Sequence, residues 1–477
     1  MADNTSHQSA APTPAATPAT SGEVAAVYFV GIGGIGMSAI ARYFLQRGLA
    51  VAGYDRTPTA LTRDLEAEGA DIHYTDDVAL IPAAFRDAAH TLVVYTPAVP
   101  ADHSELLFFR QGGFDIQKRA QVLGTLTRSH RGLCVAGTHG KTTTSSMVAH
   151  ILHQSHVRCN AFLGGITKNY GTNYLLAPDS DYVVIEADEF DRSFHHLLPW
   201  ATAITATDPD HLDIYGTEEA YLESFRHYTE LVQPGGALIL HAGLKLRPNP
   251  QPGVTTYTYS RDGGDFHAAN VRIGGGEVCF DLVSPIADIS GISLGVPVAI
   301  NIENGIAAMA LAQLAGATPD ELRRAMASFS GVERRFDFRV RTPQRAYLSD
   351  YAHHPEELRQ CIQSIREVYP GRRLVGIFQP HLYTRTRDFY REFADALAGL
   401  DEVVLTEIYP AREAPIPGVT SQLILDNLPA GKPCRLIRKA DVVDVVRQLR
   451  FDVLLTLGAG DLEDYSPAIA EAVNATL

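Results

Sequence analysis

The chain has 477 residues, of which 45% are hydrophobic and 20% are charged, and its formal net charge at pH 7 is −15. Its length predicts roughly two to four domains, and no apolar run approaches the roughly 18 residues that a membrane-spanning helix needs. The negative charge argues against a nucleic acid as the main partner, because such binding requires a basic surface.

The chain starts with a segment that is poor in large apolar residues. Residues 1–23 are rich in Ala, Pro, Thr and Ser, a composition that predicts a disordered tail, and they lack the pattern of a secretory signal. Five dispersed cysteines without a CxxC pair favour a reducing cytoplasm over a disulfide framework or a zinc site. We therefore expect a cytoplasmic protein.

A first series of strands and helices occupies residues 24–125. The apolar segments AVYFVGIGG, LAVAGYD and TLVVYTPAV surround a helical pattern from Met37 to Arg47. This alternation is typical of a parallel sheet wrapped by helices. The sequence predicts an N-terminal Rossmann-like α/β domain.

Two further α/β series follow, with expected joints near 125 and 334. Residues 126–333 contain LCVAGTHGKTTT, DYVVIEADE, ATAITATD and GGALILH, which predict a central P-loop ATPase-like domain with a parallel sheet. The β segments from about Thr255 to Val298 are interpreted as an antiparallel addition, followed by a helix from Ile302. Residues 334–477 contain RAYLSDYA, RLVGIFQP, EVVLTEIY and DVLLTLGAG, which predict a C-terminal Rossmann-like domain.

The segment GTHGKTTT, residues 137–144, predicts a phosphate-binding loop between a strand and a helix. Backbone amides and the helix N-terminus there can hold phosphates, Lys141 can neutralise them, and the Thr142 hydroxyl can face Mg²⁺. Two residues separate the glycines where the standard loop has four. The residues expected to bind nucleotide are Gly137, Thr138, His139, Gly140, Lys141, Thr142 and Thr143.

Acidic residues end the strand that follows the loop in the predicted sheet. Glu186, Asp188, Glu189 and Asp191 gather there, and we expect Glu186 to bind the metal, since hard cations prefer oxygen ligands. The next strand ends in DPDHLD, which brings His211 to the same sheet edge as a second metal or phosphate ligand.

GIGGIG, residues 31–36, fits the dinucleotide fingerprint and is followed by Asp55. This pattern predicts a diphosphate bound at a helix N-terminus, without naming the nucleotide. In the third series, strand ends carry Asp350, Tyr351, His353, His354, His381, Arg385 and Arg387. Arginines in such a cluster suit a carboxylate partner.

These motifs together resemble the Mur ligases of peptidoglycan synthesis from about Val27 to the C-terminus. The shared segments are GIGGIGMS, KRAQVLG, GTHGKTTT, EADE, DHLD, ERRFD, DYAHHP and QPHLYTRTRDF. The resemblance implies three domains that bind a UDP-sugar, ATP and an amino acid. It implies ATP- and Mg²⁺-dependent ligation of L-alanine to UDP-N-acetylmuramate through an acyl phosphate.

The resemblance also implies roles for individual residues. The UDP-sugar would lie at Gly31, Gly33, Gly34, Gly36, Asp55 and Arg119; the adenine at Asn304; and the nucleotide would also be reached by Arg335 and Asp350. The metals would be bound by Thr142, Glu186 and His211. Tyr351, His353, His381 and Arg385 would face the muramoyl carboxylate and alanine, with Lys141, His211, His353 and Arg385 as the catalytic set.

The chain departs from the family pattern at several positions. Leu382 stands where Arg is usual, Ala206 where Asn is usual, Phe190 where Ser is usual and Ile300 where His is usual, and Thr75-Asp76 replaces a Gly-His pair. These departures concern uracil and alanine recognition and leave the reaction class unchanged.

Other functions compete with this interpretation. GIGGIG with Asp55 alone indicates an NAD-dependent oxidoreductase, but that function leaves GTHGKTTT and the acidic strand ends unexplained. A nucleotide-hydrolysing regulator does not need the third domain. Within the family, a ligase that recycles murein peptides and a folate polyglutamate ligase share the ATP loop, and the GIGGIGM domain favours a sugar-linked substrate.

Overall fold

The computed structural model describes residues 24–96, 98–411 and 413–475, and the chain divides into two compact units after His130. The expected disordered tail, residues 1–23, lies outside the described residues. No helix in the described part of the chain is both long and apolar enough to cross a membrane. The domain limits expected near 125 and 334 stay predictions.

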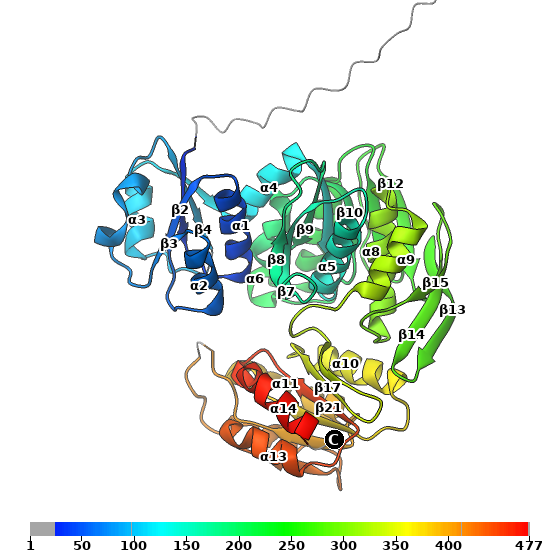
Figure 1. Cartoon of the computed structure of the whole chain (residues 1–477). Coiled ribbons are helices and arrows are strands. Elements are labelled where there is room, and N and C mark those ends of the chain that lie inside the picture. Colours follow the sequence, from blue (N-terminus) through cyan, green and yellow to red (C-terminus); the bar gives the residue numbers. More distant parts are fainter. Residues whose placement is uncertain (1–23, 97, 412, 476–477) are drawn as a thin grey trace, which may run out of the picture. The chain divides into compact units, whose positions relative to one another are not determined.

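The first unit contains one parallel sheet with the strand order β3-β2-β1-β4-β5 (Figure 1). Its strands are β1 (Ala26–Val30), β2 (Ala50–Tyr54), β3 (Asp71–His73), β4 (Thr91–Tyr95) and β5 (Asp115–Lys118). Its α-helices are α1 (Ile35–Gln46), α2 (Ala60–Ala67), α3 (Ser104–Gln111) and α4 (Arg119–Ser129). Helix α1 begins one residue after Gly34, so the glycine turn and the helix N-terminus adjoin, as the fingerprint requires.

A ten-stranded sheet forms the first part of the second unit, with the order β15-β14-β13-β12-β11-β10-β6-β9-β7-β8. The strands are β6 (Arg131–Ala136), β7 (Asn160–Thr167), β8 (Thr172–Leu175), β9 (Tyr182–Ala187), β10 (Pro199–Ile204), β11 (Ala237–His241), β12 (Thr255–Ser260), β13 (Phe266–Gly274), β14 (Glu277–Val283) and β15 (Ile289–Ser293). The helices are α5 (Lys141–Gln154), α6 (Leu212–Tyr215), α7 (Glu218–Glu230), α8 (Ile300–Leu314) and α9 (Pro319–Ser328). Strand β6, which leads into the predicted loop, lies between β10 and β9.

The predicted antiparallel addition is shorter than the sequence indicates. Strand β12 pairs in parallel with β11, so it extends the parallel part of the sheet. The chain crosses back after β11 instead of making a hairpin, because thirteen residues, 242–254, separate the two strands. Within the predicted addition, antiparallel pairing joins β13, β14 and β15 alone, and elsewhere in the sheet β7 and β8 also pair antiparallel.

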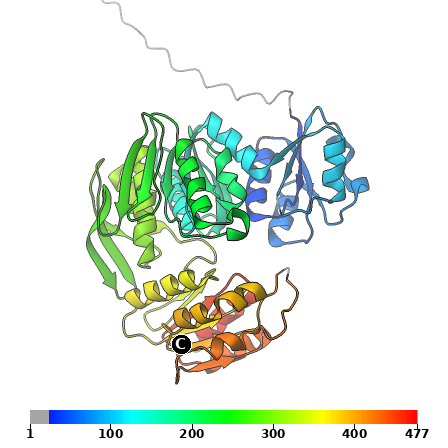
Figure 2. The same cartoon turned by 180° about the vertical axis from the view of Figure 1, so that it is seen from behind.

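A six-stranded sheet completes the second unit, with the order β16-β17-β21-β18-β19-β20. Its strands and helices are coloured from yellow to red in Figure 2. The strands are β16 (Asp337–Arg341), β17 (Ala346–Asp350), β18 (Leu374–Phe378), β19 (Glu402–Leu405), β20 (Cys434–Leu436) and β21 (Val453–Leu457), and the helices are α10 (Pro355–Val368), α11 (Tyr383–Leu397), α12 (Gln422–Leu425), α13 (Val442–Gln448) and α14 (Ser466–Ala475). Strand β16, which the sequence pattern did not predict, pairs antiparallel with β17, and the other pairs in this sheet are parallel. The prediction of an α/β fold with three successive parallel-rich sheets is confirmed.

The alternation of side chains along the six-stranded sheet builds two apolar layers. Leu348 and Leu455 belong to the cluster that includes α10 and α11, while Tyr347 and Leu454 belong to the cluster that includes α13 and α14. Successive strand residues point to opposite faces, so the sheet buries both. Helices therefore cover both sides and leave the carboxyl ends of the strands for ligands.

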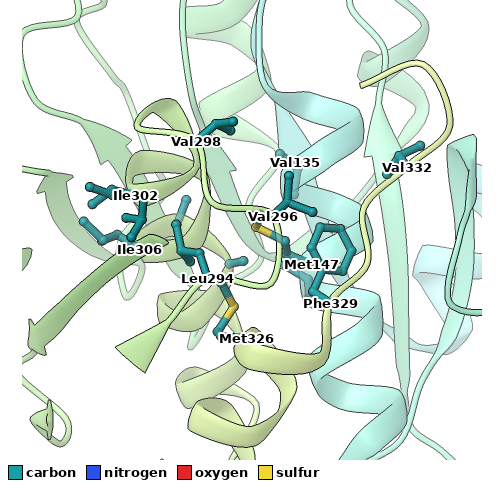
Figure 3. Packing of buried hydrophobic residues seen from close by; sticks show 14 of the residues in the cluster. Val135, Met147, Leu294, Val296, Val298, Ile302, Ile306, Met326, Phe329 and Val332 are labelled. Atoms are coloured by element: carbon teal, nitrogen blue, oxygen red, sulfur yellow. The ribbon is translucent and has the colours of Figure 1, made fainter. Parts of the chain in front are cut away.

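Helices α5, α8 and α9 pack together beside the ten-stranded sheet (Figure 3). Met147 of α5, Ile302 of α8 and Met326 of α9 are all at most 2% exposed and belong to one apolar cluster. Burial of such side chains contributes about 1.5–3 kcal/mol each. This packing fixes the first turn of α5 and the start of α8, where the predicted nucleotide residues lie.

Candidate active site

The predicted phosphate loop has two glycines in left-handed conformations. Gly137 has a φ of +132° and Gly140 a φ of +82°. A Cβ atom on Gly137 would stand 2.3 Å from Thr205 Oγ1, and one on Gly140 would stand 2.7 Å from Asn304 Oδ1. Glycine is therefore required for both conformation and space. Helix α5 begins at Lys141, so the loop ends at a helix N-terminus, where backbone amides attract anions.

Lys141 is held inside the loop by an acidic residue. Its side chain is 14% exposed, and Nζ lies 2.7 Å from Glu189 Oε2 and donates a hydrogen bond to the Gly137 carbonyl at 2.7 Å. Burial alone would lower the pKa of Lys141, but the carboxylates of Glu189 and, to a lesser extent, Asp188 and Glu186 outweigh this effect and raise the pKa. The loop therefore contains a fixed positive charge.

Two of the predicted metal ligands are neighbours. Thr142 Oγ1 donates to Glu186 Oε1 at 3.1 Å, and the backbone amide of Gly164 donates to Glu186 Oε2 at 3.1 Å. Among the described residues, no three His, Cys, Asp or Glu side chains gather as a ready metal site. A hydroxyl and one carboxylate nevertheless fit Mg²⁺, which commonly uses one or two carboxylates together with substrate phosphates and water.

His211, the other predicted metal ligand, lies just before α6. Its ring Nε2 is 3.8 Å from Asp210 Oδ2, and its ring packs edge to face on Phe190 with centroids 5.2 Å apart. It is not among the residues that line the pocket at the loop. Phe190, one of the departures from the family pattern, thus contacts this predicted ligand.

A pocket of about 330 Å³ opens beside the loop. From the loop it is lined by Thr138, His139, Gly140, Lys141, Thr142 and Thr143, and from elsewhere by residues that include Glu186, Asn304, Arg335 and Asp350. The predicted nucleotide residues other than Gly137 therefore share one cavity. Burial raises the pKa of Asp350 to about 6, although the Phe336 amide and Arg335 favour its charged form.

The departures Ala206 and Ile300 also line this pocket. The Ala206 carbonyl accepts a hydrogen bond from the Thr138 amide at 3.1 Å, so its backbone supports the loop whatever its side chain. Asn304 donates to Asn301 at 3.0 Å and accepts from Thr144 at 3.2 Å, which fixes the amide that is expected to meet adenine.

The predicted carboxylate-binding residues gather in the third domain. The rings of His353 and His381 have centroids 5.8 Å apart, and those of Tyr351 and His353 are 5.2 Å apart. Burial lowers the pKa of His353. Burial also lowers the pKa of His381, and together with the nearby His353 and Arg385 it brings that pKa to about 4. Both rings are therefore neutral near pH 7.

Arg385 supplies an unused donor to this cluster. Its Nη1 atom is buried without a hydrogen-bond partner among the described residues, as is Nδ1 of His381. Buried polar groups of this kind cost free energy unless a ligand pairs with them. Leu382, where the family usually has Arg, adopts a φ of +70° immediately before α11 and adds no charge.

The predicted UDP-sugar residues gather in the first unit. The Gly33 amide donates to Asp55 Oδ2 at 2.7 Å, and a Cβ atom on Gly36 would stand 2.3 Å from Arg119 Nη1. Gly31 has a φ of +91°, and Gly34 precedes the first residue of α1. Of the departures, Asp76 accepts hydrogen bonds from the amides of Ser104 and Glu105, so it serves the N-terminus of α3.

Sequence motifs do not identify two acidic residues of the pocket. Glu303 accepts from the Arg261 amide at 2.8 Å, and Glu357 lies 3.6 Å from the ring of His139. Glu303 depends on a contact between α8 and a distant loop, for which the sequence gives no signal. Glu357 has a local signal, since it stands three residues after His354 at the start of a helix, where a capping box is expected.

Three known domains match most of the chain. The Mur ligase family catalytic domain matches residues 26–131, the Mur ligase middle domain residues 135–312, and the Mur ligase glutamate ligase domain residues 334–460. The chain belongs to the Mur ligase family. Mur ligases are ATP-dependent ligases, so ATP is a substrate of this chain.

Individual Mur ligases resemble the chain over nearly its full length. The UDP-N-acetylmuramate--L-alanine ligase of Phocaeicola vulgatus is 63% identical over 94% of this chain and 98% of its own length, and that of Cytophaga hutchinsonii is 45% identical over 92% and 95%. The crystal structure of the UDP-N-acetylmuramate-alanine ligase from Thermotoga maritima superposes with a TM-score of 0.78 at 29% identity, covering 94% of this chain and 99% of that one. A murein peptide ligase from Psychrobacter arcticus shares the fold, with a TM-score of 0.65 and 20% identity over 95% and 99% of the two chains.

Proposed function

We propose that this Mur ligase joins L-alanine to UDP-N-acetylmuramate in peptidoglycan synthesis, converting ATP to ADP and phosphate. The observation that carries the proposal is the 63% identity, over nearly the whole chain, to a relative of that name. The unpaired Nη1 of Arg385 beside neutral histidines supports it, because the cluster suits a carboxylate. ATP and a UDP-sugar as substrates favour a cytoplasmic location.

The first step of the proposed reaction activates the sugar. The muramoyl carboxylate attacks the γ-phosphorus of ATP, the bond to the β-phosphate oxygen breaks, and ADP leaves with an acyl phosphate formed. Two anions must approach, so the site needs positive charge in the transition state. Lys141 supplies a charge fixed at the loop, and the loop amides hold the phosphate chain.

Mg²⁺ is the proposed metal of this step, and Thr142 and Glu186 would hold it, since their oxygens are 3.1 Å apart. When bound, Mg²⁺ supplies further neutralisation of phosphate charge. His211 is proposed as an additional ligand on the strength of the family motif.

The second step forms the amide. The alanine amine attacks the acyl carbon, phosphate leaves, and one ammonium proton must be removed before the attack. His353 is proposed to accept that proton, because burial lowers its pKa and keeps its ring neutral near pH 7. Arg385 would pair with a carboxylate through its free Nη1, and Tyr351 and His381 complete the wall around it.

The first unit is proposed to bind the UDP-sugar. Gly31, Gly33, Gly34 and Gly36 would place the diphosphate at the start of α1, with Asp55 and Arg119 beside it. Arg119 offers the charge that a diphosphate needs, because its guanidinium lies against Gly36. The roles of these residues are inferred from the family motif and from this arrangement.

Phosphate release tests the proposal directly. We expect release from ATP and Mg²⁺ only when UDP-N-acetylmuramate and an amino acid are both present, with L-alanine giving the highest kcat/KM and mass spectrometry showing one added alanine residue. A tripeptide used in preference to L-alanine would instead indicate a peptide-recycling ligase. Turnover without the UDP-sugar would contradict the proposal.

A further inference from the structure

Glu357 occupies a capping position at the start of α10, yet it also reaches the ATP loop. The backbone amides of His353 and His354 donate to Glu357 Oε2 at 3.0 and 3.2 Å, which closes the N-terminus of the helix. The other oxygen, Oε1, lies 3.6 Å from Nδ1 of His139. One carboxylate therefore contacts two elements that are more than 200 residues apart in the sequence.

The two histidines at Glu357 belong to different substrate sites. His139 is a loop residue in the nucleotide pocket, and His353 belongs to the carboxylate-binding cluster. Nδ1 of His353 lies 3.3 Å from Glu357 Oε2 and 3.1 Å from the Tyr351 carbonyl. Glu357 thus lies between the ring that would take a proton from alanine and the loop that holds the phosphates.

The surroundings of Glu357 keep its carboxylate charged. Its side chain is only 22% exposed, and although burial disfavours the charge, His139, His353 and Arg335 hold the pKa of Glu357 well below its usual range. A charged carboxylate beside two imidazoles attracts positive charge and favours, in each ring, the tautomer whose proton lies on the nitrogen that faces it, which is Nδ1 in both histidines.

We propose that Glu357 is a positioning residue that couples the occupancy of the ATP loop to the orientation of His353. When phosphates bind to the loop, His139 moves. Because Glu357 contacts both His139 and the first turn of α10, it moves with His139 and shifts the His353 ring. The coupling makes the amine-binding cluster competent only when nucleotide is bound. This inference rests on the proposed function for the identity of the two sites.

The chain contains a matched control for the capping role alone. Glu321 stands at the same position of α9, after Thr318 and Pro319, and its carboxylate accepts from the Thr318 amide at 2.9 Å. Glu321 also contacts a histidine, because Oε1 lies 3.0 Å from Nδ1 of His156. Neither Glu321 nor His156 lines the nucleotide pocket. Glu321→Gln therefore reproduces the chemical change without touching the proposed link.

The experiment compares two sets of variants. The test set is Glu357→Gln, His139→Asn and the double variant that combines them. The control set is Glu321→Gln, His156→Asn and their double variant. Glutamine keeps an oxygen for the capping amides and removes the charge that faces the histidine. We expect each of the first two single variants to lose about tenfold in kcat/KM for alanine, and the double variant to lose little more. Glu321→Gln should leave kcat/KM within about twofold while changing Tm as much as Glu357→Gln does.

Calorimetry separates coupling from loss of activity. With UDP-N-acetylmuramate present throughout, binding of a non-hydrolysable ATP analogue is measured with and without L-alanine. We expect alanine to change the analogue Kd by about fivefold or more in the unmodified protein and by less than about twofold in Glu357→Gln. Additive kinetic losses, or the same linkage in both proteins, would overturn the inference.

A failure of the proposed function has a different signature. If L-alanine supports no phosphate release by the unmodified protein, the proposed function fails before any variant is compared. If the unmodified protein is active and Glu357→Gln behaves like Glu321→Gln, only the coupling is wrong and Glu357 serves α10 alone.

Discussion

Two glycine turns in this molecule begin from the same local design. In the first unit, residues 31–34 connect β1 to α1, and in the second, residues 137–140 connect β6 to α5. Both turns start with a glycine of positive φ, Gly31 and Gly137, and both end at a helix N-terminus. Each backbone is therefore suited to hold an anion.

The side chains around the two turns differ. At the second turn, Lys141 is the first helical residue and Thr142 follows, with Glu189 and Glu186 hydrogen-bonded to them. At the first turn no cation follows the glycines; Asp55 accepts from the turn, and Arg119 approaches from α4. Under the proposed function, the two backbones share the ability to bind phosphate, and the charges beside each turn decide whether the phosphate is only held or also transferred.

Among these substitutions, removal of the Lys141 charge should have the largest effect on activity at the second turn. We expect Lys141→Met to lower kcat by at least about 10²–10³-fold, because a charge contact to the transferred phosphate is lost. The variant also leaves Glu189 buried and unpaired, which should destabilise the fold by about 3–5 kcal/mol.

A second substitution separates the two effects of Lys141→Met. Adding Glu189→Gln removes the unpaired charge, so thermal unfolding should recover most of the lost Tm while kcat stays low. Recovery of kcat together with Tm would show that Lys141 acts only by holding the fold.

Loss of the Glu186 charge should weaken the Mg²⁺ binding that is proposed for the second turn. We expect Glu186→Gln to raise the Mg²⁺ concentration for half-maximal activity by about 10–100-fold, because a carboxylate oxygen facing Thr142 becomes a neutral amide. A titration of activity with Mg²⁺ at saturating ATP measures the shift. An unchanged Mg²⁺ requirement would assign the metal to other residues.

Sequence predicts best what lies close together along the chain. Lys141 and Thr142 follow a strand and glycines within one segment, so their place on the loop could be inferred before the fold was known. The first turn could also be inferred, because GIGGIG lies between a strand and a helix; the hydrogen bond from the Gly33 amide to Asp55 depends on the pairing of β1 with β2 and was not predicted. The succession of three α/β domains was predictable for the same reason, because the strand and helix patterns are local.

Contacts between distant segments escaped prediction. The pairing of Lys141 with Glu189 depends on how the chain turns after β9, and the contact between Glu357 and His139 depends on packing between two domains. Periodicity marks β12 as a strand but does not give its direction relative to β11. His211 shows a different difficulty. Its motif predicts a metal ligand, but in the structure its ring packs against Phe190, so the metal-binding role stays a prediction.

Arg385→Lys tests whether the cluster of Tyr351, His353, His381 and Arg385 recognises a carboxylate by shape as well as charge. We expect kcat/KM to fall by about one to two orders of magnitude. Lysine keeps the charge but lacks the planar guanidinium, whose Nη1 atom is free to pair with a carboxylate. Steady-state kinetics with varied L-alanine and varied UDP-sugar show which carboxylate is affected. Leu382→Arg should restore part of the loss if both positions face one carboxylate, whereas additive effects in the double-mutant cycle would separate them.

Gly36→Ala at the first turn should have the smallest effect on activity, and it tests whether this turn only binds its ligand. A Cβ atom there meets the end of the Arg119 side chain, which can move aside, so the fold should remain while the guanidinium leaves its place. We expect the KM for UDP-N-acetylmuramate to rise by about three- to tenfold, with kcat and the KM for ATP unchanged, because a held diphosphate contributes binding that is equal in ground and transition states. Titration with NAD should give no saturable binding in either protein. A fall in kcat would show that the first turn takes part in the chemical step. If NAD binds saturably and UDP-N-acetylmuramate fails to displace it, the first turn is a dinucleotide site.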